Sequence, residues 1–372
     1  MTKTIAFYLP QFHPTPENNA WWGAGFTEWT NVSQARPRLK GHHQPQIPAD
    51  LGFYDLRLPE TRDAQADIAM RYGIHGFCYY HYWFNGRMLL DRPFNEVLNT
   101  GKPNFPFCLC WANENWTRAW DGLDRQVLIK QDYTKDDNNN HINWLINTFQ
   151  DDRYIKIDGR PLLLIYRLDH IPDIATMISS WRNAVRKAGF PDLYLSAVKN
   201  GFVEISDRDI LSLGFDSIVD FQPNRRDFPA PRGAKQWLYR LSRRILPSDL
   251  YQKIKLSVSA NNLVSYRAMV EGIMGGPWPT DYRKMPCVFP SWDNSARRRS
   301  ATIIQNDDPS LYGQWIKHAI KNVQSYPESE RLVFVNAWNE WAEGCHLEPD
   351  RKHGHAFLEQ TRVAIQTAGQ TE

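Results

Sequence analysis

The sequence predicts an α/β protein that folds as a single (β/α)8 TIM barrel domain over residues 1–372. Three observations predict this fold. Eight short apolar runs are spaced along the chain, segments with helical periodicity lie between them, and aromatic and polar residues gather directly after the runs. An open, doubly wound sheet is the alternative, but the first run continues into "YLPQFHP" and not into the glycine-rich turn typical of that fold.

The apolar runs have the composition of parallel strands. Segments such as "LLLIY" and "LVFV" are apolar on both faces, which is typical of strands buried between two layers. An Asp-Gly turn at residues 158–159 predicts a small hairpin before the fourth strand. The eight predicted strands are Thr4–Leu9, His75–Tyr80, Phe107–Trp111, Leu162–Tyr166, Leu193–Val198, Ser217–Phe221, Met285–Phe289 and Leu332–Ala337.

The segments between the strands have helical periodicity. Between the sixth and seventh strands an insertion leaves room for two helices, and its first part is locally basic. We expect this part to dock on the barrel, with peripheral contact to a membrane surface as the alternative. The predicted helices are Glu60–Tyr72, Met88–Leu98, Asn139–Phe149, Asp173–Lys187, Ala234–Leu246, Leu263–Met274, Pro309–Gln324 and His353–Thr367.

The connection after the first strand, Pro10–Pro59, is much longer than an ordinary strand-to-helix loop. It contains tryptophan, histidine and glutamate residues, which is not the composition of a disordered segment. We therefore predict that this long, aromatic-rich loop forms an ordered cap over the mouth of the barrel.

Composition excludes several classes of function. The formal net charge of +3 gives no reason to expect nucleic acid as a partner. No apolar run approaches the roughly 20 residues needed to span a bilayer, and "MTKTIAFYLP" lacks the apolar region of a signal peptide. The five cysteines are odd in number and lack zinc-ligand spacing, which indicates reduced thiols. We expect a cytoplasmic protein without a metal or another cofactor.

Aromatic and polar side chains are concentrated at the C-terminal ends of the predicted strands and in the cap, where TIM barrels bind substrates. Aromatic rings stack on the apolar faces of sugars, and Asn, Gln, Asp, Glu and His pair with sugar hydroxyls. For any single tryptophan a role in the core is about equally expected, but the whole set predicts an oligosaccharide or polysaccharide site. The predicted substrate-binding residues are Tyr8, Gln11, His13, Trp22, Glu28, Trp29, His81, Tyr82, Trp83, Trp111, Asn113, Glu114, Trp116, Tyr166, Trp292, Asp293, Asn336, Trp338, Asn339 and Trp341.

Two glutamates follow the eighth strand, in "WNEWAEGCHLEP". If the chain turns after Glu340, the carboxyl groups of Glu340 and Glu343 face one cavity and can divide acid and base roles, as glycoside cleavage requires. The alternative is that Glu343 lies in the first turn of the next helix, where a carboxylate is favoured anyway. The spacing alone does not decide between them.

Several longer motifs resemble known families. The segment "WNEWAEG" resembles the endo-α-1,2-mannosidase family, glycoside hydrolase family 99, and "YLPQFHP", "HQPQIPADLGFYD", "GFCYYHYWF" and "CWANENWTRAWDG" resemble its WbsX-type relatives from bacterial surface-polysaccharide gene clusters. The resemblance implies a TIM barrel acting on α-linked glycans such as those of O-antigen or capsule. It implies that Glu340 acts as a base at the 2-hydroxyl and Glu343 as the general acid/base, with net retention.

Two other functions remain open from the sequence. A glycosyltransferase of lipopolysaccharide or O-antigen biosynthesis would use a nucleotide sugar and a divalent ion, and Asp207-Arg208-Asp209 resembles the D-x-D motif of such enzymes. A non-catalytic glycan-binding module would not need the two glutamates. The turn "SWDNSARRRS" is consistent either with arginines near an anionic sugar or with a surface turn.

Overall fold

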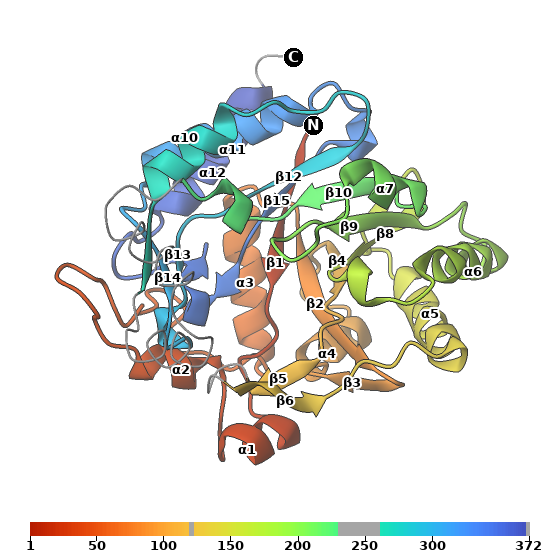
Figure 1. Ribbon diagram of the computed structural model, residues 1–372, viewed down its shortest axis with the longest axis horizontal. Coiled ribbons are helices and arrows are strands. Elements are labelled where there is room, and N and C mark those ends of the chain that lie inside the picture. Colours follow the sequence, from red (N-terminus) through yellow and green to blue (C-terminus); the bar gives the residue numbers. More distant parts are fainter. Residues whose placement is uncertain (119–122, 230–260, 370–372) are drawn as a thin grey trace, which may run out of the picture.

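The protein is a closed (β/α)8 barrel, as the sequence predicts (Figure 1). The computed structural model describes residues 1–118, 123–229 and 261–369. Eight parallel strands pair in a ring, and the last strand hydrogen-bonds to the first, with Ala6 beside Val335. In order around the ring these are β1 (Lys3–Tyr8), β2 (Gly76–Phe84), β4 (Phe107–Trp111), β8 (Arg160–Ile165), β9 (Tyr194–Val198), β10 (Ser217–Asp220), β12 (Lys284–Val288) and β15 (Leu332–Val335).

The barrel strands are buried on both faces. All residues of β4, β9, β10 and β15 are buried, because one side of each strand faces the barrel interior and the other faces a layer of helices. The helices in the described part of the chain are α1 (Pro16–Trp22), α2 (Glu28–Gln34), α3 (Pro59–Arg71), α4 (Arg92–Thr100), α5 (Lys135–Phe149), α6 (Ile174–Lys187), α7 (Asp207–Ser212), α10 (Tyr266–Met274), α11 (Pro309–Val323) and α12 (Ala356–Gly369).

Helix α11 shows why these segments are helical. Asp308 caps its first turn by accepting hydrogen bonds from the backbone amides of Ser310 and Leu311, and Pro309 occupies the first helical position. One face of the helix then buries Leu311, Trp315 and other apolar residues. That face packs on β12 and β15, and a neighbouring face packs on α12.

Three details differ from the sequence prediction. The segment predicted as a helix from Met88 begins as strand β3 (Arg87–Leu89), which pairs back on β2, and the helix starts only at Arg92. The helix predicted from Leu263 begins as strand β11 (Asn262–Ser265). Helix α7 was not predicted at all, because six residues are too few to show helical periodicity.

The predicted Asp-Gly hairpin is present. Asp158 and Gly159 both have positive φ angles, of 50° and 77°. They join β7 (Lys156–Ile157) to β8 in an antiparallel pair. The predicted helix at Ala234–Leu246, and most of the basic insertion around it, lie outside the described residues. No helix in the part of the chain that the structure describes has the length and apolar character needed to cross a bilayer.

The segment after β1 is an ordered cap, as predicted. Its helix α2 packs on the short 3-10 turn η6 (Trp341–Glu343) that follows β15. The Trp29 ring lies 4.8 Å from Phe12 and 5.4 Å from Trp341, measured between ring centroids. Farther along the cap, His42 and Gln44 hydrogen-bond to the carboxylate of Asp293, at 2.6 and 2.7 Å. The cap is therefore fixed to the loops that follow β12 and β15.

Smaller strands surround the mouth of the barrel. They are β5 (Trp116–Arg118) paired with β6 (Leu123–Ile129), β13 (Trp292–Asp293) and β14 (Thr302–Gln305) in a sheet with β11, and β16 (Asn339–Glu340) paired with β17 (Cys345–His346). Figure 1 shows the β5–β6 hairpin and helices α1 and α2 at the same end of the molecule. This is the end at which the barrel strands finish.

Candidate active site

A cavity of about 870 Å³ opens at the C-terminal ends of the barrel strands. Its walls come from the barrel, the cap, the β5–β6 hairpin and the loops after β9, β10 and β12. The residues that line it include Gln11, Trp22, Tyr80, Tyr82, Glu114, Trp116, Tyr166, Arg167, Asn200, Phe202, Arg225, Trp292, Arg297, Arg298, Asn336, Glu340 and Glu343. A cavity of this size and polarity can hold an oligosaccharide unit.

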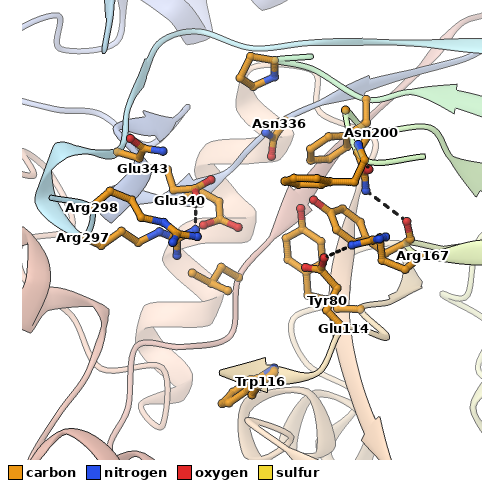
Figure 2. A pocket seen from close by; sticks show the side chains of 18 of the residues that line it. Tyr80, Glu114, Trp116, Arg167, Asn200, Arg297, Arg298, Asn336, Glu340 and Glu343 are labelled. Atoms are coloured by element: carbon orange, nitrogen blue, oxygen red, sulfur yellow. Dashed lines mark hydrogen bonds and ion pairs between the residues drawn. The ribbon is translucent and has the colours of Figure 1, made fainter. Parts of the chain in front are cut away.

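Glu340 and Glu343 lie on the same wall of this cavity (Figure 2). After β15 the chain forms a tight hairpin, in which Glu340 ends β16, Glu343 ends η6 and Cys345 begins β17. Gly344 makes the turn with a φ angle of 56°, and a Cβ atom there would lie 3.1 Å from three atoms of Asp293. The turn thus brings together two carboxyl groups that an extended strand would point in opposite directions.

The hairpin is held to the first strand by Asn339. Its side-chain amide accepts a hydrogen bond from the Leu9 backbone N–H at 2.7 Å and donates to the Leu9 carbonyl at 3.0 Å. Asn113 makes the same pair of bonds to the backbone of Arg167, both at 2.8 Å. Both asparagines are wholly buried, so they act on the site by fixing loops and not by touching a ligand.

A half-buried arginine lies among the carboxylates. The guanidinium of Arg297 contacts the Glu343 carboxylate and lies 3.8 Å from the carboxylate of Glu28, a cap residue with no exposed surface. Arg38 fixes the turn that carries Arg297, because its guanidinium donates to the carbonyls of Ser295 and Arg299 at 2.5 and 2.8 Å. Cap and barrel together therefore place one cation among several glutamates.

Burial controls the protonation of this cluster. It raises the pKa of Glu340 well above the usual range, the charge of Glu343 raises it further, and Arg297 opposes both. Burial likewise raises the pKa of Glu28 to about 7, again opposed by Arg297. Oε2 of Glu340 is buried and has no hydrogen-bond partner among the residues that the structure describes. In the free protein, Glu340 is thus favoured as the neutral acid, while Arg297 provides the counter-charge for Glu343.

The facing wall of the cavity is polar and aromatic. Glu114 and Arg167 form an ion pair of 2.7 Å there, beside Tyr80 and Asn200 (Figure 2). At the base of the cavity Asn336 donates to the Gln222 carbonyl at 2.9 Å, and its Oδ1 has no partner. Rings for stacking and unpaired acceptors at the base suit a ligand with many hydroxyl groups.

Ten of the 22 predicted site residues meet at the cavity. The structure places the two glutamates and eight of the predicted substrate-binding residues in its lining: Gln11, Trp22, Tyr82, Glu114, Trp116, Tyr166, Trp292 and Asn336. The others lie behind the lining, where they pack or hydrogen-bond, and their direct contact with a substrate stays a prediction.

Three of these residues lie on the outer face of the barrel. His81, Trp83 and Trp111 pack against helix α5 through its residue His141, with ring centroids 4.6 to 5.0 Å away. Burial lowers the pKa of His81 to about 3. The Trp83 ring nitrogen donates to Asp137 at 2.8 Å. These residues join the strands to the helix layer and do not face the cavity.

The remaining residues support the site from behind the cavity lining. Tyr8 donates to Gln65 at 2.7 Å, and Gln65, Tyr54 and Trp341 all donate to the buried carboxylate of Glu348, at 2.6 to 2.8 Å. This network is called the Glu348 clamp below. Asp293 anchors the cap as described. Asn113 and Asn339 hold loops through their hydrogen bonds to the backbone of Arg167 and of Leu9. The other predicted residues buried or packed behind the lining are His13, Glu28, Trp29 and Trp338.

Several lining residues were not among the predicted site residues. Tyr80 and Arg167 stand at strand ends and could have been included on that ground. Asn200 follows β9 by two residues, a position that is readable in the sequence once the strand is placed. Arg297 belongs to the arginine run for which a surface turn was an equal alternative. Only the contacts of Arg38 and Glu28 reveal that its side chain points inward.

No metal centre is evident in this region. Among residues 1–118, 123–229 and 261–369, no three His, Cys, Asp or Glu side chains form a group that could hold a metal ion. Asp207 of the D-x-D segment contacts Lys199 and Tyr282, and the Asp209 carboxylate accepts a hydrogen bond from the hydroxyl of Ser206, the residue that caps helix α7, so both have structural partners.

Comparison with known proteins gives two kinds of relatives. The family described as "Glycosyltransferase WbsX" matches residues 4–361. The uncharacterized protein WxcX of Xanthomonas campestris pv. campestris, in strains ATCC 33913 and B100, is 41% identical over 366 residues. That match covers 98% of this chain and 50% of the relative, so the chain spans about half the length of the curated relatives it matches.

Similar solved structures share the barrel. A GH99 endo-alpha-mannosidase from Bacteroides thetaiotaomicron has a TM-score of 0.57 and 13% identity, covering 99% of this chain and 97% of that one. A structure described as a glycoside hydrolase-like protein has a TM-score of 0.59 and 13% identity, covering 98% and 93%. At this level of identity the likeness concerns the fold.

Proposed function

The chain belongs to the WbsX family, and from that premise we propose that it is a retaining, glycoside hydrolase-like enzyme that cleaves or remodels α-linked glycans of bacterial surface polysaccharide. Family and fold indicate a glycan-active enzyme. The observation that carries the finer proposal is the placement of Glu340 and Glu343 on one wall of an 870 Å³ cavity at the C-terminal end of the barrel.

The reaction requires one proton on the carboxyl pair. In the route that the resemblance implies, the ionised Glu340 takes the proton of the 2-hydroxyl as that oxygen attacks the anomeric carbon. Glu343 protonates the departing glycosidic oxygen, and a 1,2-anhydro sugar forms. Water, deprotonated by Glu343, then opens this ring at the anomeric carbon, and O2 recovers its proton from Glu340, so that the configuration is retained.

The protonation of Glu340 in the free site affects how the acid and base roles are assigned to Glu340 and Glu343. In the resting state the shared proton is favoured on Glu340, so it must sit on Glu343 when the glycosidic bond breaks. For two interacting acids, a pH profile reports the number of protons and not their location. The acid role is decided instead by an aryl glycoside with an acidic leaving group, which needs no protonation. We expect Glu343→Gln, and not Glu340→Gln, to recover activity on such a substrate.

The proposal is tested by turnover on a panel of defined α-linked oligosaccharides with no nucleotide sugar added, followed by NMR of the first-formed anomer. We expect cleavage with retention, and a loss of about 10³-fold or more in kcat for Glu340→Gln and Glu343→Gln on natural leaving groups. Glu328→Gln, an exposed position far from the cavity, serves as the matched control. Unchanged turnover in both active-site variants would refute the assignment.

A glycosyltransferase is the second candidate, because the family to which the chain belongs carries that description. The same assay separates the two functions. Product that forms only after a nucleotide sugar and Mn²⁺ or Mg²⁺ are supplied, with no cleavage of any glycan, would favour the transferase and overturn the hydrolase proposal.

A further inference from the structure

Phe202 stands out at the rim of the cavity because its ring is 56% exposed although it lines the cavity. Its backbone N–H donates to the Asn200 side chain at 3.0 Å, and the Asn200 amide in turn donates to the Tyr166 carbonyl at 3.3 Å. The ring is therefore held in place by the loop that follows β9. An exposed aromatic ring that the fold positions at a cavity points to a ligand.

Two guanidinium groups lie against this ring. The central carbon of Arg167 is 5.4 Å from the ring centroid and that of Arg225 is 5.8 Å away. The loops that carry Phe202 and Arg225 are close together, because a Cβ atom on Gly201 would lie 3.4 Å from the Arg225 backbone nitrogen. Phe202 thus orders both guanidiniums by cation–π contact, which reduces the entropy they would lose on binding a ligand.

The two arginines differ in their charge balance. Arg167 is neutralised by ion pairs of 2.7 Å to both Glu114 and Asp169. Arg225 is exposed, lines the cavity and has no carboxylate partner among the described residues. An ordered guanidinium without a counter-ion presents a planar pair of donors to the cavity, and this geometry matches the two oxygens of a carboxylate or a phosphate.

We propose that Phe202 and Arg225 form a subsite for an anionic group of the substrate, either the carboxylate of an acidic sugar or a phosphate. The subsite rests on the proposed function, in that it assumes that the cavity binds a glycan or an activated sugar. Asn200 and Arg167, its neighbours, face the wall that carries Glu340 and Glu343 across the cavity (Figure 2). The anionic group therefore binds away from the glycosidic bond that reacts.

The test is a binding measurement that needs no turnover. An array of oligosaccharide pairs that differ only at C6, glucose against glucuronate and galactose against galacturonate, is probed with the wild type, Arg225→Met and Arg225→Lys. UDP-glucose and glucose are compared by titration as the phosphate arm. Arg208→Met is the control, since Arg208 is 82% exposed and paired with Asp281 outside the cavity.

We expect the wild type to bind the anionic member of a pair at least about tenfold more tightly than the neutral one. Arg225→Met should abolish this preference, Arg225→Lys should keep part of it, and Arg208→Met should leave it unchanged. A preference confined to the carboxylate pairs identifies an acidic sugar, and one confined to UDP-glucose identifies a phosphate. Equal binding of charged and neutral probes by the wild type, or an undiminished preference in Arg225→Met, overturns the proposal.

The test of the anionic subsite and the test of the proposed function can fail independently of each other. If no glycan is cleaved, the hydrolase proposal fails, yet the array still reports whether an anion binds through Arg225. If a neutral glycan is cleaved, Arg208→Met should retain the kcat of the wild type on it, because Arg208 lies outside the cavity.

Discussion

Arg297 is the residue on which the protonation of the site depends. It is the cation that lies among Glu28, Glu340 and Glu343, and it lowers the proton affinity of both Glu28 and Glu340. Replacing it with methionine removes one positive charge from a buried cluster of acids. The carboxyl groups must then bind protons at higher pH, because ionised groups cannot be left unpaired in the interior.

We expect Arg297→Met to move to higher pH the limb of the kcat/KM profile that reports the ionisation of Glu340. Without the guanidinium, the attraction that opposes the raised pKa of Glu340 is lost. Arg297→Lys, which keeps the charge, is the control and should move the profile less. A profile that stays in place in Arg297→Met, in a variant with wild-type thermal stability, would contradict this account.

At the scale of single residues, the sequence predicted the types of side chain at the site better than the directions in which these side chains point. Of the residues predicted on β2, Tyr82 lines the cavity, whereas His81 and Trp83 lie on the opposite face of the strand. The reason is that β2 runs on to Phe84, beyond the predicted end at Tyr80. Side chains keep alternating along this extra length, so Tyr80 and Tyr82 face inward while His81 and Trp83 face the helices.

The hairpin after β15 is the element that makes two glutamates into a pair. Its turn depends on Gly344, which has a positive φ angle and no room for a side chain. The sequence contains this glycine, but not the neighbour that makes it necessary, since Asp293 is some fifty residues away. The long-range contact is the part that spacing alone could not predict.

Gly344→Ala tests the hairpin. The φ angle costs a non-glycine residue about 1–2 kcal/mol, and relief of the contact with Asp293 must move the backbone between Glu343 and Cys345. We expect a lower free energy of unfolding and at least a tenfold lower kcat. Gly272→Ala, at a helical glycine with open space around it, should leave kcat unchanged and should raise the free energy of unfolding by up to about 1 kcal/mol. Wild-type kcat in Gly344→Ala would show that the turn tolerates distortion.

The Glu348 clamp joins helix α3, the cap and η6 through one carboxyl group. Burial raises the pKa of Glu348 to about 7, against the opposing effect of its three hydrogen-bond donors. The folded state therefore holds a proton that the unfolded chain releases near pH 4.5. The stabilisation from this proton is complete below about pH 4.5 and is lost as the pH rises through about 7.

A comparison of the wild type with Glu348→Gln isolates this effect. The difference in their free energies of unfolding should fall by about 2–3 kcal/mol between pH 5 and pH 8, since each unit of pKa corresponds to about 1.4 kcal/mol. Chemical denaturation at several pH values measures it. A difference that does not change with pH would mean that the donors from Tyr54, Gln65 and Trp341 keep the carboxyl group ionised in the folded state throughout.

Over the whole molecule, the barrel separates stability from chemistry. The N-terminal ends of the strands carry packing, and the C-terminal ends carry the cavity. The eight strands were predictable because each is a short apolar run, and all eight were found to within a few residues. The cap was predictable from its length and aromatic residues, but its anchoring through Asp293 and Trp341 was not, because those contacts join segments about 250 or more residues apart.

Gly76→Ala tests this separation. Gly76 begins β2 at the closed end of the barrel, where a Cβ atom would lie 2.6 Å from the Pro106 carbonyl oxygen. We expect the free energy of unfolding to drop by about 1–3 kcal/mol, with kcat/KM of the folded protein at 20 °C unchanged. Thermal unfolding and kinetics on the same sample give both values. A loss of activity without a loss of stability would contradict the view that the N-terminal strand ends determine stability and the C-terminal ends determine activity.

The closure of the barrel also sets the order in which the protein can be completed during synthesis. Strand β1 leaves the ribosome before the other strands of the barrel, yet its partner β15, and Asn339, which binds the backbone of Leu9, are made more than 320 residues later. Until then one edge of β1 is unpaired and both candidate catalytic glutamates are missing. A ribosome-bound chain is thus inert towards glycans for most of its elongation, and the interval during which that edge is open is when a chaperone would have reason to bind it.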